Sequence, residues 1–130
     1  MQGFTYHFPT RVVFGCGTVR QVGRECLKLG GSKAFVVTGT TATVTSPGFA
    51  AVREALQEAN LPFEVYARIE HDPTLEAVEA GRQAARACGA DMIVAYGGGS
   101  PLDAGKAIAM LATNPGAIED YLYVKQVFQT

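Results

Sequence analysis

Two short runs of apolar residues constrain the fold of this chain most strongly. Residues 34–38 read AFVVT, and residues 92–96 read MIVAY. The first run is too short for a helix and is bounded by Gly on both sides, which is typical of a strand that is covered on both faces. The second run is also predicted to be a strand. Residues 63–67 (FEVYA) add a third candidate strand. The pattern therefore predicts a sheet buried between two layers.

A first helix is predicted before these strands. Thr18 is a candidate N-cap, and Gly30 ends the segment. Apolar residues recur within it at helical spacing, at Val19, Val22, Cys26 and Leu29. This spacing predicts one buried stripe.

Two further helices are predicted between the strands. One begins at Ser46-Pro47, ends at Asn60 and precedes the strand 63–67; its inward face comprises Phe49, Val52, Leu56 and Ala59. The other begins at Pro73-Thr74 and ends at Gly89, before a strand over residues 91–96. Its inward face comprises Leu75, Val78, Gly81, Ala85 and Cys88.

The order of these elements predicts an α/β fold. Strands that alternate with helices imply right-handed crossovers and an open, mainly parallel, Rossmann-like sheet with helices on both faces. Residues 4–8 and 11–14, aromatic or β-branched and separated by Pro9, predict an amino-terminal β-hairpin or a pair of edge strands. A length of 130 residues with 48% hydrophobic residues suits one domain over residues 1–130.

The sequence GGGSPLDAGKAIA, residues 97–109, indicates an anion-binding turn. Glycines let a ligand approach the backbone, and the free N–H groups of a helix's first turn then face a phosphate; Pro101 suits the first helical position. Ligands of such sheets lie at the carboxyl ends of the strands. The loops 39–45, 70–74 and 97–103 are expected there.

Other interpretations of this segment remain open. Asp103 and Lys106, three residues apart on one helix face, either reach a bound nucleotide or form a local ion pair. Glycine-rich turns also occur at junctions that bind nothing. A P-loop is excluded because no GK[ST] follows the glycines, and GCGTVR at residues 15–20 lacks a third glycine.

Charge and composition exclude several classes of function. A net charge of −1 with scattered Lys and Arg favours neither nucleic acid nor an anionic membrane as partner. The sequence shows no signal peptide and no long apolar run. Its three dispersed cysteines are expected to be buried and unpaired, which is typical of a reducing compartment. We therefore expect a cytoplasmic protein. His7 and His71 lack partners at metal-ligand spacing, so no metal site is predicted, and His71 is expected at the surface.

The motifs PTRVVFGCG, VVT at residues 36–38, DPT at 72–74 and GGGSPLDAGKAIAM resemble those of the iron-containing (group III) alcohol dehydrogenases. The resemblance implies an amino-terminal α/β domain that binds NAD or NADP. It also implies a helical carboxyl-terminal domain, which holds iron or zinc through one Asp and three His and is absent from these residues. Hydride transfer would then require that missing domain, and no catalytic residue is assigned here.

The resemblance also implies roles for single residues. The pyrophosphate-binding turn is matched by Gly98, Gly99 and Ser100, and Gly97 shapes it. Asp103 and Lys106 both stand at the family's spacing behind the glycines. Asp103 matches the acidic residue that lines the nicotinamide end of the cleft. Asp72 falls where many relatives have Asn near the adenosine. NAD-preferring relatives often carry Asp after the first long strand, where this chain has Gly39, Thr40 and Thr41. This difference slightly favours NADP.

Three alternatives to an alcohol dehydrogenase remain open. A glycerol dehydrogenase or dehydroquinate synthase relative also carries a GGG turn, but SPLDAGKAIA favours the alcohol dehydrogenase branch. Nucleotide kinases usually place Asp within the glycine turn, where this chain has GGGS. A non-catalytic flavodoxin-like module would use the glycines only structurally. Apolar surface exposed where the helical domain would dock predicts self-association into a homo-oligomer.

Overall fold

The computed structural model describes residues 3, 5 and 7–124. In chain order, its elements are 3-10 helix η1 (Thr18–Gln21), α1 (Val22–Lys28), β1 (Ala34–Gly39), α2 (Thr41–Val44), α3 (Pro47–Glu58), β2 (Phe63–Ile69), α4 (Leu75–Ala87), β3 (Met92–Tyr96), α5 (Gly99–Thr113) and 3-10 helix η2 (Ile118–Val124). Strands and helices alternate from β1 onward. The predicted α/β organisation is confirmed.

The three strands form a parallel sheet in the order β2-β1-β3. Ala34 at the start of β1 pairs with Phe63 on one side and with Met92 on the other. At the other end, Gly39 pairs with Ile69, and Thr38 pairs with Tyr96. The carboxyl ends of all three strands therefore meet at one edge of the sheet.

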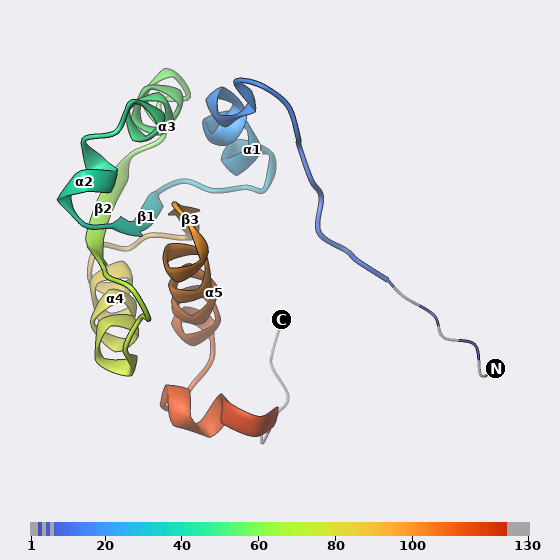
Figure 1. The fold of residues 1–130 in the computed structure, drawn as a ribbon, viewed down its shortest axis with the longest axis vertical. Helices are drawn as coiled ribbons and strands as arrows, with labels where there is room; N and C mark the ends of the chain where they lie inside the picture. The colour runs from blue at the N-terminus through green and yellow to red at the C-terminus, as the bar shows by residue number, and fades with distance from the viewer. Residues whose placement is uncertain (1–2, 4, 6, 125–130) are drawn as a thin grey trace.

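Helices cover both faces of the sheet, as predicted. Helices α1 and α3 lie on one face and α4 and α5 on the other, as Figure 1 shows. All six residues of β1 are buried, which agrees with the uninterrupted apolar run. The larger buried side chains include Phe49 and Leu56 on the α3 side and Ile108 and Leu111 on the α5 side.

The predicted starts of two helices are confirmed by their capping geometry. The Ser46 hydroxyl accepts a hydrogen bond from the Phe49 N–H (3.2 Å), and Pro47 occupies the first turn of α3. The Thr74 hydroxyl accepts from the Ala77 N–H at the same distance. These side chains satisfy N–H groups that have no acceptor within their own helix.

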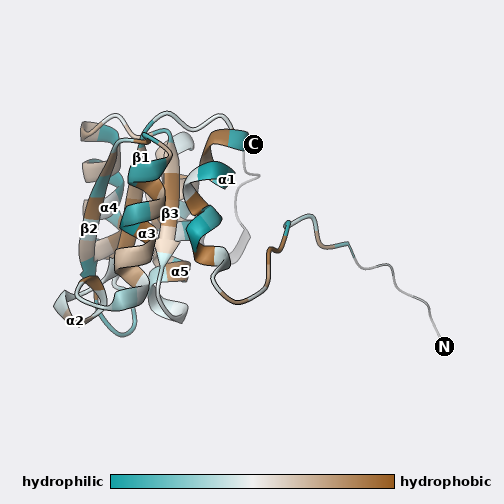
Figure 2. Cartoon of the chain, turned by 90° about the horizontal axis from the view of Figure 1, so that it is seen from above, coloured by the Kyte–Doolittle hydropathy of each residue, from teal (hydrophilic) through white to brown (hydrophobic). Residues whose placement is uncertain are grey.

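The amino-terminal β-hairpin is wrong for the residues that the structure describes. Residues 7–14 form no strand, and this arm leads away from the folded body in both views (Figures 1 and 2). Val12 is 69% exposed and Phe14 is 99% exposed. Strand propensity reflects how well a side chain fits a partly buried sheet, and this arm has no such sheet beside it. Residues 4 and 6 lie outside the described residues.

The first helix also differs from its prediction. Gly17 stands at the N-cap, and the Thr18 hydroxyl instead donates to the Gly15 carbonyl oxygen (3.0 Å). Leu29 lies beyond the end of α1 and is 78% exposed. Leu75, predicted to face inward, is 39% exposed at the first residue of α4, and Cys16 is exposed. Each of these residues lies at or outside the end of an element, where helical spacing no longer implies burial.

Asp91 joins the starts of β1 and β3. Its carboxylate accepts hydrogen bonds from the N–H groups of Ser32 (2.9 Å) and Lys33 (2.9 Å) and from the Ser32 hydroxyl (2.6 Å). The bond from the Lys33 N–H, followed by those from Ser32, favours the ionised form and lowers the pKa of Asp91 from 3.8 to about 2.

Asp91→Asn is expected to lower the melting temperature at pH 7, because an amide oxygen accepts these bonds more weakly than a carboxylate. The folded-state pKa is the lower one, so the carboxylate stabilises the fold above about pH 4, and this contribution is lost as the pH falls toward 2. The difference in melting temperature between variant and parent should therefore shrink as the pH falls from about 4 toward 2, as measured by thermal melts. Glu58→Gln, at an exposed position on α3, serves as the control. A pH-independent difference would contradict this account.

Gly105 lets α5 lie directly against β3. A β-carbon at this position would stand 2.7 Å from the Ala95 β-carbon, well inside van der Waals contact. We expect Gly105→Val to destabilise the fold by about 1–3 kcal/mol through overpacking, measured by urea denaturation. Lys106→Val, at the adjacent exposed position, is the control. Equal stability of both variants would show that this contact is not tight.

Candidate functional site

A cleft of ≈ 440 Å³ opens at the carboxyl edge of the sheet. It is where the three loops expected at that edge come together, and its lining comprises Gly39, Thr40, Ala42, Thr43, Ile69, Glu70, His71, Gly97, Gly98, Gly99, Ser100 and Pro101. The strand order also reverses here, since β2 and β3 lie on opposite sides of β1. This is the position at which open α/β sheets bind ligands.

Gly97 shapes the turn between β3 and α5. Its φ of +141° lies in a region that side chains with a β-carbon rarely adopt, and a β-carbon would stand 2.9 Å from Pro101 Cγ. Helix α5 begins at Gly99, so Pro101 occupies its third position and not the first as predicted. Gly97 is therefore required by the fold itself.

Gly98 and Gly99 differ from Gly97 in this respect. A β-carbon at either position would meet nothing within 4 Å, and Gly98 has an ordinary φ of −82°. Gly98 is the N-cap of α5 and supplies no side-chain hydrogen bond to the helix. The first N–H groups of a helix have no acceptor within it, and here they lie beside open space in the cleft. Neither glycine is needed for packing, and together they leave room for a ligand.

The end of β1 forms the opposite wall. The buried Thr38 hydroxyl donates to the Tyr96 carbonyl oxygen (2.9 Å), which ties β1 to β3 one residue before the cleft. The predicted Thr-rich loop then contains the short helix α2. This helix carries Thr43 back toward β1, so that a β-carbon on Gly39 would stand 2.6 Å from Thr43 Oγ1.

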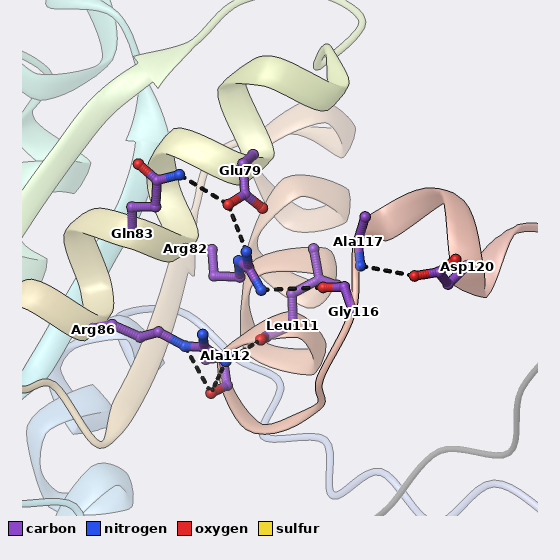
Figure 3. Close-up of polar contacts among 9 residues, drawn as sticks. All are labelled: Glu79, Arg82, Gln83, Arg86, Leu111, Ala112, Gly116, Ala117 and Asp120. Atoms are coloured by element: carbon purple, nitrogen blue, oxygen red, sulfur yellow. Dashed lines mark hydrogen bonds and ion pairs between the residues drawn. The ribbon is translucent and has the colours of Figure 1, made fainter.

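Helix α4 fixes the far end of α5. Figure 3 shows Arg86 donating from Nε to the Ala112 carbonyl oxygen (3.2 Å) and from a terminal nitrogen to that of Leu111 (2.9 Å). Arg82 donates to the Gly116 carbonyl oxygen (3.2 Å) and pairs with Glu79. Arg86 thus satisfies carbonyl groups at the negative end of the α5 dipole, and Arg82 binds the segment that follows the helix. The positive end of α5 lies at the cleft.

The structure brings together six of the predicted site residues. Gly39, Thr40, Gly97, Gly98, Gly99 and Ser100 all line the cleft, and four others do not, namely Thr41, Asp72, Asp103 and Lys106. Asp103 and Lys106 form an ion pair on α5 (3.1 Å), with side chains 70% and 78% exposed. The local ion pair that the spacing allowed is thus present.

Asp72 borders a smaller hollow next to the cleft. This hollow of ≈ 150 Å³ is lined by Arg68, Pro73 and Thr74 among others, and it shares Glu70 and His71 with the cleft. Asp72 has a φ of 55°, a left-handed conformation in which Asp and Asn are the most tolerated side chains after Gly. This turn directs the chain from β2 into α4.

Six further residues line the cleft that the sequence did not single out as site residues, although all but Ile69 fall in the loops expected at this edge: Ala42, Thr43, Ile69, Glu70, His71 and Pro101. Thr43 matters most, because it brings a hydroxyl group to the end of β1. The signal that could have found it is its position four residues after Gly39. One turn of helix between the two would place them side by side, but a segment this short has no helical pattern to read.

The described residues offer no obvious metal site. No group of three or more His, Cys, Asp or Glu side chains gathers anywhere in residues 3, 5 and 7–124. Nor is any helix within those residues both long and apolar enough to cross a bilayer.

Comparisons with known proteins agree on one family. The family model described as "Iron-containing alcohol dehydrogenase" matches residues 9–130. Sulfoacetaldehyde reductase from Bilophila wadsworthia is 32% identical over 130 residues, covering 95% of this chain and 32% of the relative.

Two solved structures give the same result. The NADH-dependent butanol dehydrogenase A of Thermotoga maritima superposes with a TM-score of 0.92 at 26% identity, covering 99% of this chain and 32% of that one. A 1,3-propanediol oxidoreductase gives a TM-score of 0.87 at 32% identity, covering 92% and 31%. The chain thus spans about a third of the length of these relatives. It belongs to the iron-containing alcohol dehydrogenase family.

Proposed function

We propose that this chain is the nucleotide-binding part of a metal-dependent alcohol dehydrogenase that transfers hydride between NAD(P) and an alcohol or aldehyde. The observation that carries the proposal is the pair Gly98 and Gly99. Both border the cleft at the start of α5, and both leave the space of a β-carbon empty. A diphosphate that approaches the backbone closely is the ligand that such a space suits.

Backbone groups would hold the pyrophosphate. The N–H groups of Gly99 and Ser100 begin α5, and the Ser100 hydroxyl lies in the same wall. No Lys or Arg lines the cleft within the residues described, so the helix dipole and these donors would balance the phosphate charge. Gly97 would act indirectly, because its backbone conformation sets the turn that directs the start of α5 toward the pyrophosphate.

The adenosine end would lie across the sheet edge, toward β1. Gly39 offers no carboxylate there, and Thr40 lines the cleft beside it. Because no carboxylate follows β1, the repulsion that would exclude a 2′-phosphate is reduced, which favours acceptance of NADP as well as NAD. The NADH-dependent butanol dehydrogenase A named above supports NAD for this family.

Residues outside the cleft would contribute at its margins. Asp103 lies one turn into α5 and, by its motif position, would border the nicotinamide end, with Lys106 paired to it. Thr41 on α2 and Asp72 after β2 would flank the adenosine side. When bound, the nicotinamide ring exchanges the hydride, and the divalent metal, iron or zinc, would be held by residues outside this chain.

The rest of the protein would be the main partner. The arm before η1 exposes Val12 and Phe14, and helical polypeptide or a second copy of the chain could cover them.

The three cysteines are free, which suits a cytoplasmic location.

Calorimetric titration with NAD, NADP and ATP tests the proposal. We expect dinucleotide binding, and we expect Gly99→Val to weaken it by at least about tenfold, because the side chain would enter the space that the pyrophosphate needs. Binding of ATP alone would favour a nucleotide kinase, and binding of none of the three would contradict the proposal.

Stability measurements separate the roles of the three glycines. Gly98→Ala and Gly99→Ala should change the free energy of unfolding by less than about 1 kcal/mol, because their β-carbons meet no atoms. Gly97→Ala should cost about 1–3 kcal/mol, because of its positive φ and its contact with Pro101. Urea denaturation gives these values. Equal losses for all three variants would remove the argument that Gly98 and Gly99 are reserved for a ligand.

A further inference from the structure

We propose that Thr43 is the residue that contacts the 2′ position of the adenosine ribose, and that its hydroxyl contributes more to binding NADP than to binding NAD. This inference rests on the proposed nucleotide-binding function. It adds a specificity-determining residue that neither the glycine turn nor the motif positions identify.

The first observation is steric. A β-carbon on Gly39 would stand 2.6 Å from Thr43 Oγ1 and 3.4 Å from Thr43 Cβ. The Thr43 hydroxyl therefore lies where the side chain of a larger residue 39 would have to pass. Gly39 and Thr43 are complementary: a side chain at residue 39 and the hydroxyl at residue 43 exclude each other.

The second observation concerns the hydrogen bonds of the neighbouring threonines. The Thr45 hydroxyl donates to the Thr41 carbonyl oxygen (3.0 Å), and the Thr38 hydroxyl donates to that of Tyr96 (2.9 Å). In the part of the chain that the structure describes, the Thr43 hydroxyl has no such acceptor. Thr43 is also half-buried and lines the cleft. Its hydroxyl is thus a donor with no acceptor among the described residues, on a side chain that lines the cleft.

Charge decides which ligand gains most from this donor. A hydroxyl can bond to a ribose 2′-OH or to a 2′-phosphate, and the bond to the charged oxygen is roughly twice as strong. Glu70 is the one carboxylate among the described residues that line the cleft, and it follows Ile69, the strand partner of Gly39. Its exposed charge opposes a 2′-phosphate, but salt screens that repulsion. The contribution of Thr43 should therefore be clearest at physiological ionic strength.

Calorimetric titration of the chain with NADP and NAD tests the inference in three variants. Thr43→Val keeps the shape of the side chain and removes the hydroxyl. It should weaken NADP binding by about tenfold or more, and NAD binding by less than about threefold. Thr43→Ser retains the hydroxyl and should keep the parent ratio of the two affinities. Thr45→Val, two residues further on and outside the cleft lining, should also leave that ratio unchanged.

The steric part has its own readout. Gly39→Ala should lower the melting temperature, and Gly39→Ala combined with Thr43→Ala should restore it, because the second change removes the atom that the new β-carbon meets. Restored stability together with the altered affinity ratio supports the inference.

The possible failures are distinguishable. If the parent chain binds both dinucleotides and Thr43→Val leaves their affinity ratio unchanged, the role of Thr43 is refuted while the proposed function stands. If the parent chain binds neither dinucleotide, the proposed function fails and the role of Thr43 fails with it.

Discussion

The parallel pairing of β1 on both of its sides is the constraint on which the rest of the structure depends. All six residues of β1 are buried, so both faces of the strand must be covered, and helices α1 and α3 and helices α4 and α5 provide that cover. Parallel strands also end at the same edge of the sheet. The cleft is a direct consequence, because the backbone groups that follow β1, β2 and β3 come together at that edge.

Much of the fold could be predicted from the sequence because β1, β3 and the longer helices carry local signals that agree with their tertiary surroundings. Ser46 and Thr74 cap helices where the sequence placed them, since a cap needs only the residues that follow it. The hairpin was wrong for the opposite reason. Residues 7–14 have strand-like composition, but a strand forms only where another strand is free to pair with it, and composition contains no information about that partner.

The candidate site was partly predictable for the same reason. The glycine turn follows a recognisable strand and precedes a recognisable helix, so its place at the sheet edge was inferred from order alone. Thr43 could not be inferred in this way. Its position depends on α2, a helix of four residues, and short helices are set by their surroundings because too few hydrogen bonds form to offset the cost of ordering them. The spacing of Asp103 and Lys106 allows either an ion pair or a contact with a nucleotide, and only the geometry shows that they form an ion pair outside the cleft lining.

The glycines around α5 illustrate why residue type alone does not define a binding site. Gly97 is needed for its backbone conformation, and Gly105 is needed for the close approach of α5 to β3. Neither backbone conformation nor packing requires a glycine at residue 98 or 99. A glycine that neither conformation nor packing requires adds flexibility to the unfolded chain without stabilising the folded one. Its presence then needs another cause, and space for a ligand against the backbone is the cause that the cleft supplies. The same reasoning links Gly39 to Thr43, because the Thr43 hydroxyl lies within 2.6 Å of the place that a β-carbon on Gly39 would take, and both residues line the cleft.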